Sequence, residues 1–234
     1  MSNHGPGGAR QFVSYTFYRV MPEWRRLDED TRRRGREEFA AVLDEYRPSI
    51  FLRSYSLVGT RADCDLMLWK AASELEIFTQ IEGELNGTLL GGYLERPHAY
   101  LCTMKRSVYL QDGVAGDRHG SRLQARAGSG KYLFVYPFVK QRRWYSMSQE
   151  DRQAAMNEHF AVGGRYPDFE VNTAYSFGLD DQEFVVSFEG EDPHRFVDLV
   201  MELRGTEASA YTERDTPIFT CIATDLPRAL ELLG

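Results

Sequence analysis

The feature of this sequence that most constrains its fold is an internal repeat. Trp24 and Trp144 lie 120 residues apart, and each follows an apolar, aromatic segment and precedes a polar stretch. Further along the chain, matching residues lie 118 apart. These matches are Phe78 with Phe196, residues 84–88 with 202–206, Tyr93 with Tyr211 and Arg96 with Arg214. An ordered series of matches at a nearly constant separation indicates a tandem duplication.

Each half has the same expected order of elements. Apolar and aromatic segments predict strands at residues 12–20, 51–57, 65–69 and 99–103, and again at 132–139, 171–177, 183–188 and 217–223. A helix follows the first strand of each half, and in the second half Ser148 and Asp151 form a capping-box pattern. An amphipathic helix precedes each last strand. The order β-α-β-β-α-β is the ferredoxin-like unit, so the sequence predicts an α+β fold of tandem ferredoxin-like modules with antiparallel sheets, of the dimeric α+β barrel type.

The expected domain organisation follows from the repeat. Residues 1–10 form a flexible leader and residues 11–109 the first module. Residues 110–130, which are rich in Gly and Arg and show no periodicity, form a connector loop, and residues 131–234 form the second module. Long loops in compact domains are often functional or disordered.

Composition excludes several classes of protein. The formal charge of −7, from 28 basic and 35 acidic residues, argues against a nucleic-acid partner. No apolar run approaches the ~18 residues that a membrane span requires. Three isolated cysteines form neither a disulfide framework nor a CxxC metal site. The leader lacks the apolar region of a signal peptide, so a cytoplasmic protein is expected.

A histidine marks the second half as different from the first. His159 stands where the first half has Phe39. Helical spacing places Met156 and other apolar residues on or beside its face, so the side chain is expected to point inward. A satisfied core histidine and a metal ligand or acid/base group both remain open at this point.

Other polar residues also occur in the second half only. They are Tyr136, Lys140, Arg204, Glu207 and Ser209, although Lys140 could also be a solvated strand end. Their concentration in one copy of the repeat predicts a ligand cavity there. One inward histidine cannot hold zinc alone, but one axial histidine suffices when a macrocycle supplies the other ligands, as in haem proteins. Glu207 is then the candidate carboxylate to orient the imidazole, and Arg, Lys and Ser suit propionate groups.

Several long motifs resemble a known family. They are VYPFVK followed by Trp144-Tyr145, the EHF segment that contains His159, SFGLDDQEF at 176–184, and LVMELRGTEAS with YTERDTPIFT at 199–220. Together they are similar to the chlorite dismutase family, which includes the bacterial coproheme decarboxylases. The resemblance covers the chain after residue 11. It implies two ferredoxin-like modules in each subunit and a homo-oligomer, with a pentamer expected.

The resemblance also implies roles for individual residues. His159 corresponds to the proximal ligand of the haem iron, and Glu207 or its neighbour corresponds to the carboxylate that supports this ligand. Tyr136 corresponds to the tyrosine that becomes the oxidising radical, and Lys140 corresponds to the lysine beside it. The aromatic pair near the haem corresponds to Trp144 and Tyr145, and the propionate-binding groups correspond to Arg204 and Ser209. The distal position that carries Arg in chlorite dismutases is Val171 here. His119, in the connector, is the candidate for the distal histidine of the actinobacterial decarboxylases.

The function that the resemblance implies is haem-dependent oxidoreduction. The expected reaction is oxidative decarboxylation of coproheme III to haem b with hydrogen peroxide, on an iron-containing coproheme III or haem b cofactor. The partners are therefore a porphyrin substrate and peroxide. Alternatives are a generic haem peroxidase, a weak chlorite-decomposing enzyme, a non-enzymatic haem-binding protein, and a cofactor-free binding module.

Overall fold

The chain forms nine strands and six α-helices over the part that the computed structural model describes, residues 10–109 and 123–234. The strands are β1 (Phe12–Val20), β2 (Phe51–Ser56), β3 (Leu66–Ala72), β4 (Leu94–Met104), β5 (Tyr132–Lys140), β6 (Glu170–Tyr175), β7 (Phe184–Gly190), β8 (Thr212–Arg214) and β9 (Phe219–Ala223). The helices are α1 (Glu29–Tyr46), α2 (Glu76–Gly87), α3 (Arg142–Ser146), α4 (Gln149–Gly163), α5 (Pro193–Arg204) and α6 (Leu226–Glu231). His119 lies outside the described residues, as do most of the predicted leader and connector.

The strands close into a ring. Their order is β7-β6-β4-β1-β3-β2-β9-β5-β8, and β7 also pairs with β5, which closes the strands from β7 to β5 into a ring. Strand β8 pairs with β5. All strand pairs are antiparallel. Strands of the two halves meet where β4 pairs with β6 and where β2 pairs with β9. The expected α+β fold with antiparallel sheets is confirmed, and both halves share one barrel.

The ring gives each strand an inner and an outer face, because side chains alternate along a strand. On β5, Leu133 and Val135 belong to the core inside the barrel, together with Tyr15 and Trp69 of the first half. The residues of β5 that alternate with these two face outward, and among them Phe134 is part of a separate apolar cluster. The period-two pattern that predicts β5 therefore also separates the barrel core from an outer layer.

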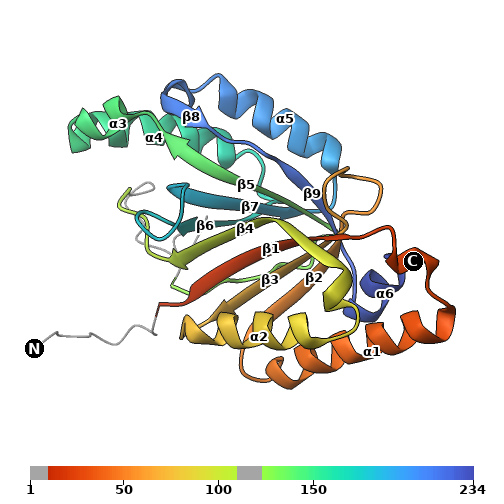
Figure 1. The fold of residues 1–234 in the computed structure, drawn as a ribbon. Helices are drawn as coiled ribbons and strands as arrows, with labels where there is room; N and C mark the ends of the chain where they lie inside the picture. Colours follow the sequence, from red (N-terminus) through yellow and green to blue (C-terminus); the bar gives the residue numbers. More distant parts are fainter. Residues whose placement is uncertain (1–9, 110–122) are drawn as a thin grey trace, which may run out of the picture.

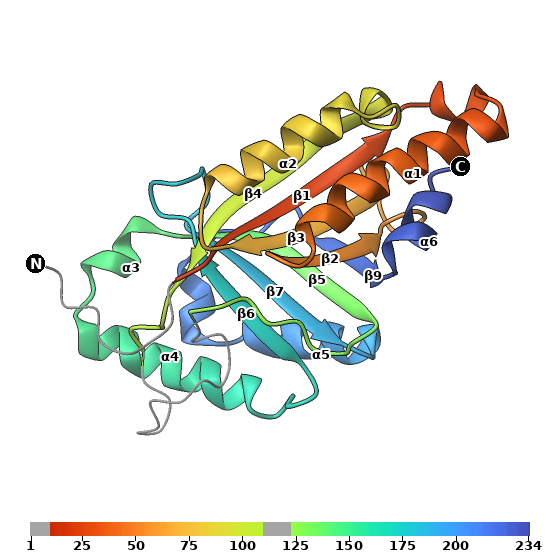
Figure 2. The same ribbon diagram turned by 90° about the horizontal axis from the view of Figure 1, so that it is seen from below.

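Helices cover the outer faces on opposite sides of the barrel. Figures 1 and 2 show α1, α2 and α6 on the side of the first half and α4 and α5 on the side of the second. Helix α6 was not expected from the sequence, yet Asp225 caps its start, Pro227 lies in its first turn, and Leu226 and Leu230 join the core beneath α1. None of the described helices is long and apolar enough to cross a membrane.

The repeat is visible in individual contacts. The Trp24 and Tyr93 ring centroids lie 5.7 Å apart with the planes tilted by 53°, and those of Trp144 and Tyr211 lie 5.3 Å apart with a tilt of 54°. The expected cap at Ser148 is also confirmed, since its side chain accepts a hydrogen bond from the backbone N–H of Asp151. The duplication therefore fixes packing geometry as well as the order of elements.

The last strand differs from its predicted bounds. The sequence predicts one strand over 217–223, but the structure has β8 at Thr212–Arg214 and then β9, which begins at Phe219. Both strands pair with β5, and residues 215–218 lie between the two pairings. Pro217 has no N–H for a strand ladder, which accounts for the later start of β9.

The outer face of the first half is filled. Phe39 and Leu43 of α1 are fully buried against Tyr18 and Leu68 of the barrel. Beside them, Lys70 of β3 is buried and forms an ion pair with Glu82 of α2, which also accepts a hydrogen bond from the Tyr18 hydroxyl. Apolar packing and this ion pair occupy the space between helices and barrel.

Gly91 is the first-half counterpart of Ser209, 118 positions earlier, and the space around it does not admit a serine side chain. A Cβ at Gly91 would lie 1.9 Å from the Leu85 carbonyl oxygen, so the backbone would have to move. We expect Gly91→Ser to lower the free energy of unfolding by about 3 kcal/mol, measured by chemical denaturation. Gly92→Ala is the matched control, because a Cβ there meets nothing within 4 Å. Equal stability of the two variants would contradict this explanation.

Candidate functional site

A large cavity lies on the outer face of the second half. Its volume is about 950 Å³, and it is enclosed by β5, β6 and β7 of the barrel and by α4 and α5. The outward residues of the three strands, among them Phe134, Val186 and Phe188, form its floor. The same space in the first half is packed, so the cavity is a property of one copy of the repeat.

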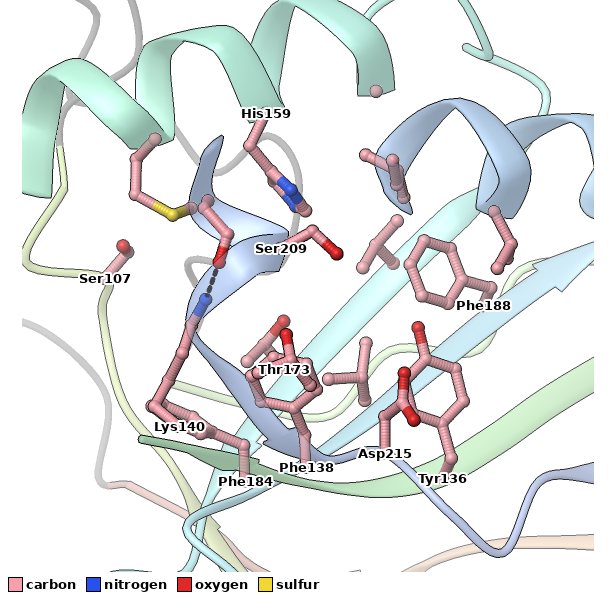
Figure 3. A pocket seen from close by; sticks show the side chains of 18 of the residues that line it. Ser107, Tyr136, Phe138, Lys140, His159, Thr173, Phe184, Phe188, Ser209 and Asp215 are labelled. Carbon is pink, nitrogen blue, oxygen red and sulfur yellow. Dashed lines mark hydrogen bonds between the residues drawn. The ribbon is translucent and has the colours of Figure 1, made fainter. Parts of the chain in front are cut away.

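Most of the predicted site residues meet in this cavity. Tyr136, Lys140, Trp144, Tyr145, His159, Val171, Arg204 and Ser209 all line it, and they come from β5, α3, α4, β6, α5 and the turn after α5. Figure 3 shows Tyr136, Lys140, His159 and Ser209 around one space. Residues that are 73 positions apart, such as Tyr136 and Ser209, are thereby brought together.

His159 projects from α4 into the cavity (Figure 3). Ala155 and Val162 anchor this helix by their burial. Burial, followed by the charge of Lys140, lowers the pKa of His159 to about 4, so the imidazole is neutral near pH 7. Within the described residues its ring nitrogens form no hydrogen bond. A neutral, unbonded imidazole in a cavity can offer a lone pair to a metal.

Glu207, the predicted support of His159, is not among the residues that line the cavity. It is the first residue of a short 3-10 helix, Glu207–Tyr211, and its side chain is exposed. Its backbone N–H donates to Glu158 Oε2 at 2.7 Å, while the next residue, Ala208, is buried against the cavity. The turn therefore directs Ala208 inward and Glu207 toward solvent.

Lys140 is buried at the end of β5 rather than solvated. Its ammonium donates to the Ala208 carbonyl and lies 4.4 Å from the centre of the Trp144 ring (Figure 3). Burial lowers its pKa to about 8, and the charge of Glu183 opposes that shift. The amine can therefore hold or release a proton close to neutral pH.

Tyr136 presents its phenol to the cavity from the middle of β5. Its ring stacks with Phe188 at a centroid distance of 6.2 Å, and within the described residues its hydroxyl has no hydrogen-bond partner. Burial raises the pKa of Tyr136, the charge of Asp215 raises it further, and Arg204 lowers it. The phenol is therefore protonated at neutral pH.

Asp215 was missed by the sequence analysis. It lies near Tyr136 in the cavity wall (Figure 3), between the two pairings of β5. Its carboxylate forms an ion pair of 2.5 Å with Arg204. The polar segment that contains it was noted only as a motif. Its first-half counterpart at a separation of 118 is Pro97, so comparison of the halves could have identified it.

Glu183 was also missed, although its role is duplicated. It accepts hydrogen bonds from the backbone N–H of Lys140 at 2.8 Å and from the Tyr145 hydroxyl at 2.5 Å. In the first half, Asp65 accepts the same kind of bond from the backbone N–H of Val20 at 2.9 Å. A carboxylate therefore anchors the first-strand end of each half, and in the second half it also positions Tyr145.

The cavity continues to the surface through apolar side chains. All but one of the large exposed apolar residues in the described chain line it, and Val58 is the exception. Those in the wall are Val108, Phe177, Leu179, Val197, Met201 and Ile218. Clustering of exposed apolar surface around one opening is typical of a binding site for a large apolar molecule.

The donor set fits a metal held in a macrocycle and not a bare metal ion. Among the described residues, no group of three or more His, Cys, Asp and Glu side chains could hold an ion. A metal bound by His159 would need its other ligands from the bound molecule. Apolar walls with Lys140, Arg204 and Ser209 around them suit a macrocycle that carries carboxylate groups.

Comparison with known proteins agrees with this geometry. The sequence profile of the chlorite dismutase family matches residues 32–224. A coproheme decarboxylase of Mycolicibacterium smegmatis is 32% identical, over 79% of this chain and 81% of that protein. The crystal structure of a mutant chlorite dismutase from Candidatus Nitrospira defluvii superposes with a TM-score of 0.87 at 25% identity, covering 97% of this chain and 96% of that one. A haem-binding protein from Thermus thermophilus has the same fold, with a TM-score of 0.82 at 22% identity over 99% of this chain and 100% of that one.

The ammonium of Lys140 over Trp144 provides a direct test of the site's electrostatics. Since the Lys140 pKa of about 8 is below its ordinary value of 10.5, the charge over the indole is present below pH 8 and is lost above it. The same shift predicts that the free energy of unfolding rises with pH between these two values. We expect tryptophan emission to change with a midpoint near pH 8 and the change to disappear in Lys140→Met. Persistence of the transition in that variant would assign it to another group.

Proposed function

The chain belongs to the chlorite dismutase family, and on that premise we propose that it converts coproheme III to haem b with hydrogen peroxide. The observation that carries the proposal is the placement of His159 and Tyr136 in one cavity, the first with a neutral imidazole and the second with a phenol that no described residue hydrogen-bonds. The similarity to a coproheme decarboxylase supports the substrate.

The reaction balances with peroxide alone as oxidant. In each of two rounds, one propionic acid side chain and one hydrogen peroxide give a vinyl group, carbon dioxide and two molecules of water. When the porphyrin is bound, its iron supplies the chemistry that uses peroxide. The protein supplies binding, orientation and proton handling. His159 binds the iron, and the apolar walls keep water away from the propionate.

Tyr136 relays one oxidising equivalent in this scheme. Its O–H would give up a hydrogen atom to the oxidant formed from peroxide and would recover one from the propionate side chain. The second oxidising equivalent of the same peroxide would remove one further electron, the carboxyl group would leave as carbon dioxide, and its proton would end in water. Burial of Tyr136 keeps the phenol protonated, so a complete hydrogen atom is available. Lys140 and Ser209 supply donors for a propionate carboxylate, and Lys140 can exchange its proton because its pKa is about 8. Trp144 and Tyr145 form the wall beside Lys140.

Val171 argues against chlorite as the substrate. It lines the cavity from β6 and offers neither a charge nor a hydrogen-bond donor. A preorganised donor facing a developing negative charge is worth about 3 kcal/mol, or roughly a hundredfold in rate. The chlorite-decomposing alternative is therefore the weaker one. Assembly as a homopentamer, location in the cytoplasm, the domain boundaries and a distal role for His119 stay predictions.

Iron ligation is tested by His159→Ala. We expect the variant to lose the histidine-ligated ferric spectrum and to bind ferric coproheme at least tenfold more weakly, because His159 is the only histidine among the described residues that line the cavity. His194→Ala is the matched control, since His194 is exposed near the start of α5 and is not part of the cavity wall. An unchanged spectrum in His159→Ala would remove the assignment.

The relay is tested by Tyr136→Phe, which removes only the hydroxyl. We expect similar affinity for coproheme and little change in the ferric spectrum, since the stacking on Phe188 remains. Loss of carbon dioxide, followed by mass spectrometry of the porphyrin, should fall by orders of magnitude, with oxidative bleaching in its place. Formation of haem b within a few-fold of the unaltered protein would exclude the tyrosine relay.

A further inference from the structure

Arg152 is a charged cavity residue to which the proposed function gives no role. It lies on α4 seven residues before His159, which is two helical turns or about 10 Å along the axis. Both residues line the cavity. The Nε of Arg152 is buried and has no hydrogen-bond partner among the described residues, while one of its terminal nitrogens donates to Gln149 at 3.1 Å.

The first half shows what such an arginine needs for structure alone. Arg32 occupies the equivalent position of α1, and its Nε is likewise buried and unbonded. Its terminal nitrogen, however, lies 2.6 Å from the carboxylate of Glu29. Gln149 replaces that glutamate in the second half, so Arg152 keeps the geometry of its counterpart but has lost the negative charge.

Two other cations of the cavity wall are also uncompensated by the described carboxylates. Lys105 and Arg10 line the wall with Arg152, and within the described residues none of the three forms an ion pair. Lys105 lies over the ring of Tyr175, and Arg10 donates to the Met104 carbonyl. The acidic residues next to Arg152 in sequence, 150 and 151, are exposed. Among the described residues, these three cations of the cavity wall thus lack a carboxylate partner, and Arg152 contributes a half-buried guanidinium to them.

We propose that Arg152 binds a propionate carboxylate of the porphyrin that His159 ligates, in the place that Glu29 takes on Arg32. This inference rests on the proposed function for the identity of the ligand. The separation of two turns along α4 sets the guanidinium apart from the imidazole, so a macrocycle held by His159 would reach Arg152 with a group at its edge. A guanidinium favours a carboxylate over other groups because it offers paired N–H donors in a plane. Arg152 therefore selects porphyrins with free propionates.

The test measures equilibrium binding without peroxide. The ligands are ferric coproheme III and iron-free coproporphyrin III. Their dissociation constants are measured from the quenching of tryptophan fluorescence at several salt concentrations. We expect Arg152→Gln to lower the affinity for both ligands about tenfold, which is the loss typical of one hydrogen bond to a charged group. We also expect the affinity to depend less on salt concentration in this variant. Since coproporphyrin has no iron, its loss of affinity reports the carboxylate contact and not ligation by His159.

Two further variants separate charge from structure. Gln149→Glu keeps Arg152 and gives it a carboxylate partner like that of Arg32 in the first half. We expect this variant also to have a lower affinity for both ligands. Arg32→Gln is the matched control, and its affinities should equal those of the unaltered protein. Unchanged affinity in Arg152→Gln and Gln149→Glu, with binding by the unaltered protein intact, would overturn the role of Arg152. Failure of the unaltered protein to bind ferric coproheme would instead overturn the proposed function.

Discussion

Closure of the strands into a ring is the constraint on which the rest of the molecule depends. Because β7 pairs with both β6 and β5, the sheet closes on itself, with one face inside the barrel and the other face outside it. Every strand has residues that fill the barrel and residues that need cover from outside. The inner residues of both halves merge into one core, which includes Trp69 and Val135. The outer faces remain separate, and they are where the two halves diverge.

The outer layers differ in what occupies equivalent positions. In the first half, Lys70 and Glu82 form a buried ion pair beneath α2, and Phe39 fills the space beneath α1. In the second half the residues 118 positions later are Phe188 and Val200, both in the cavity wall. A buried pair is costly to break because the remaining charge would be unpaired, so the first half resists opening. The second half has two apolar side chains at these positions, and a cavity remains beside them.

The sequence predicts much of the fold and a central part of the site, for one physical reason. Period-two and helical patterns determine which side of an element a residue faces, so the positions of Tyr136 and His159 in one cavity follow from the repeat. The pattern does not identify which residue of the segment after α5 faces the cavity, because Glu207–Tyr211 is a short 3-10 helix without sustained periodicity. A shift of one residue there exchanges the inward and outward positions, and Ala208 rather than Glu207 lines the cavity. Glu183 was missed because its partners Lys140 and Tyr145 lie 43 and 38 residues away, and they meet Glu183 at the end of the β5–β7 pairing. Asp215 lies only 11 residues from Arg204, and it was missed because it was not compared with Pro97 of the first half.

The ring also determines the order in which the protein can be completed. The last strand along the chain, β9, lies between β2 and β5 in the ring, and the hydrogen bond from Ser54 to Thr224 beside the β2–β9 pairing spans 170 residues. Contacts so distant in sequence form late and slowly, and until then β2 and β5 present open strand edges that favour aggregation. Asp215 and Thr220, which complete the cavity wall, belong to the same late segment. A chain still emerging from the ribosome therefore has no finished pocket, and ligand loading must follow synthesis of the final strand.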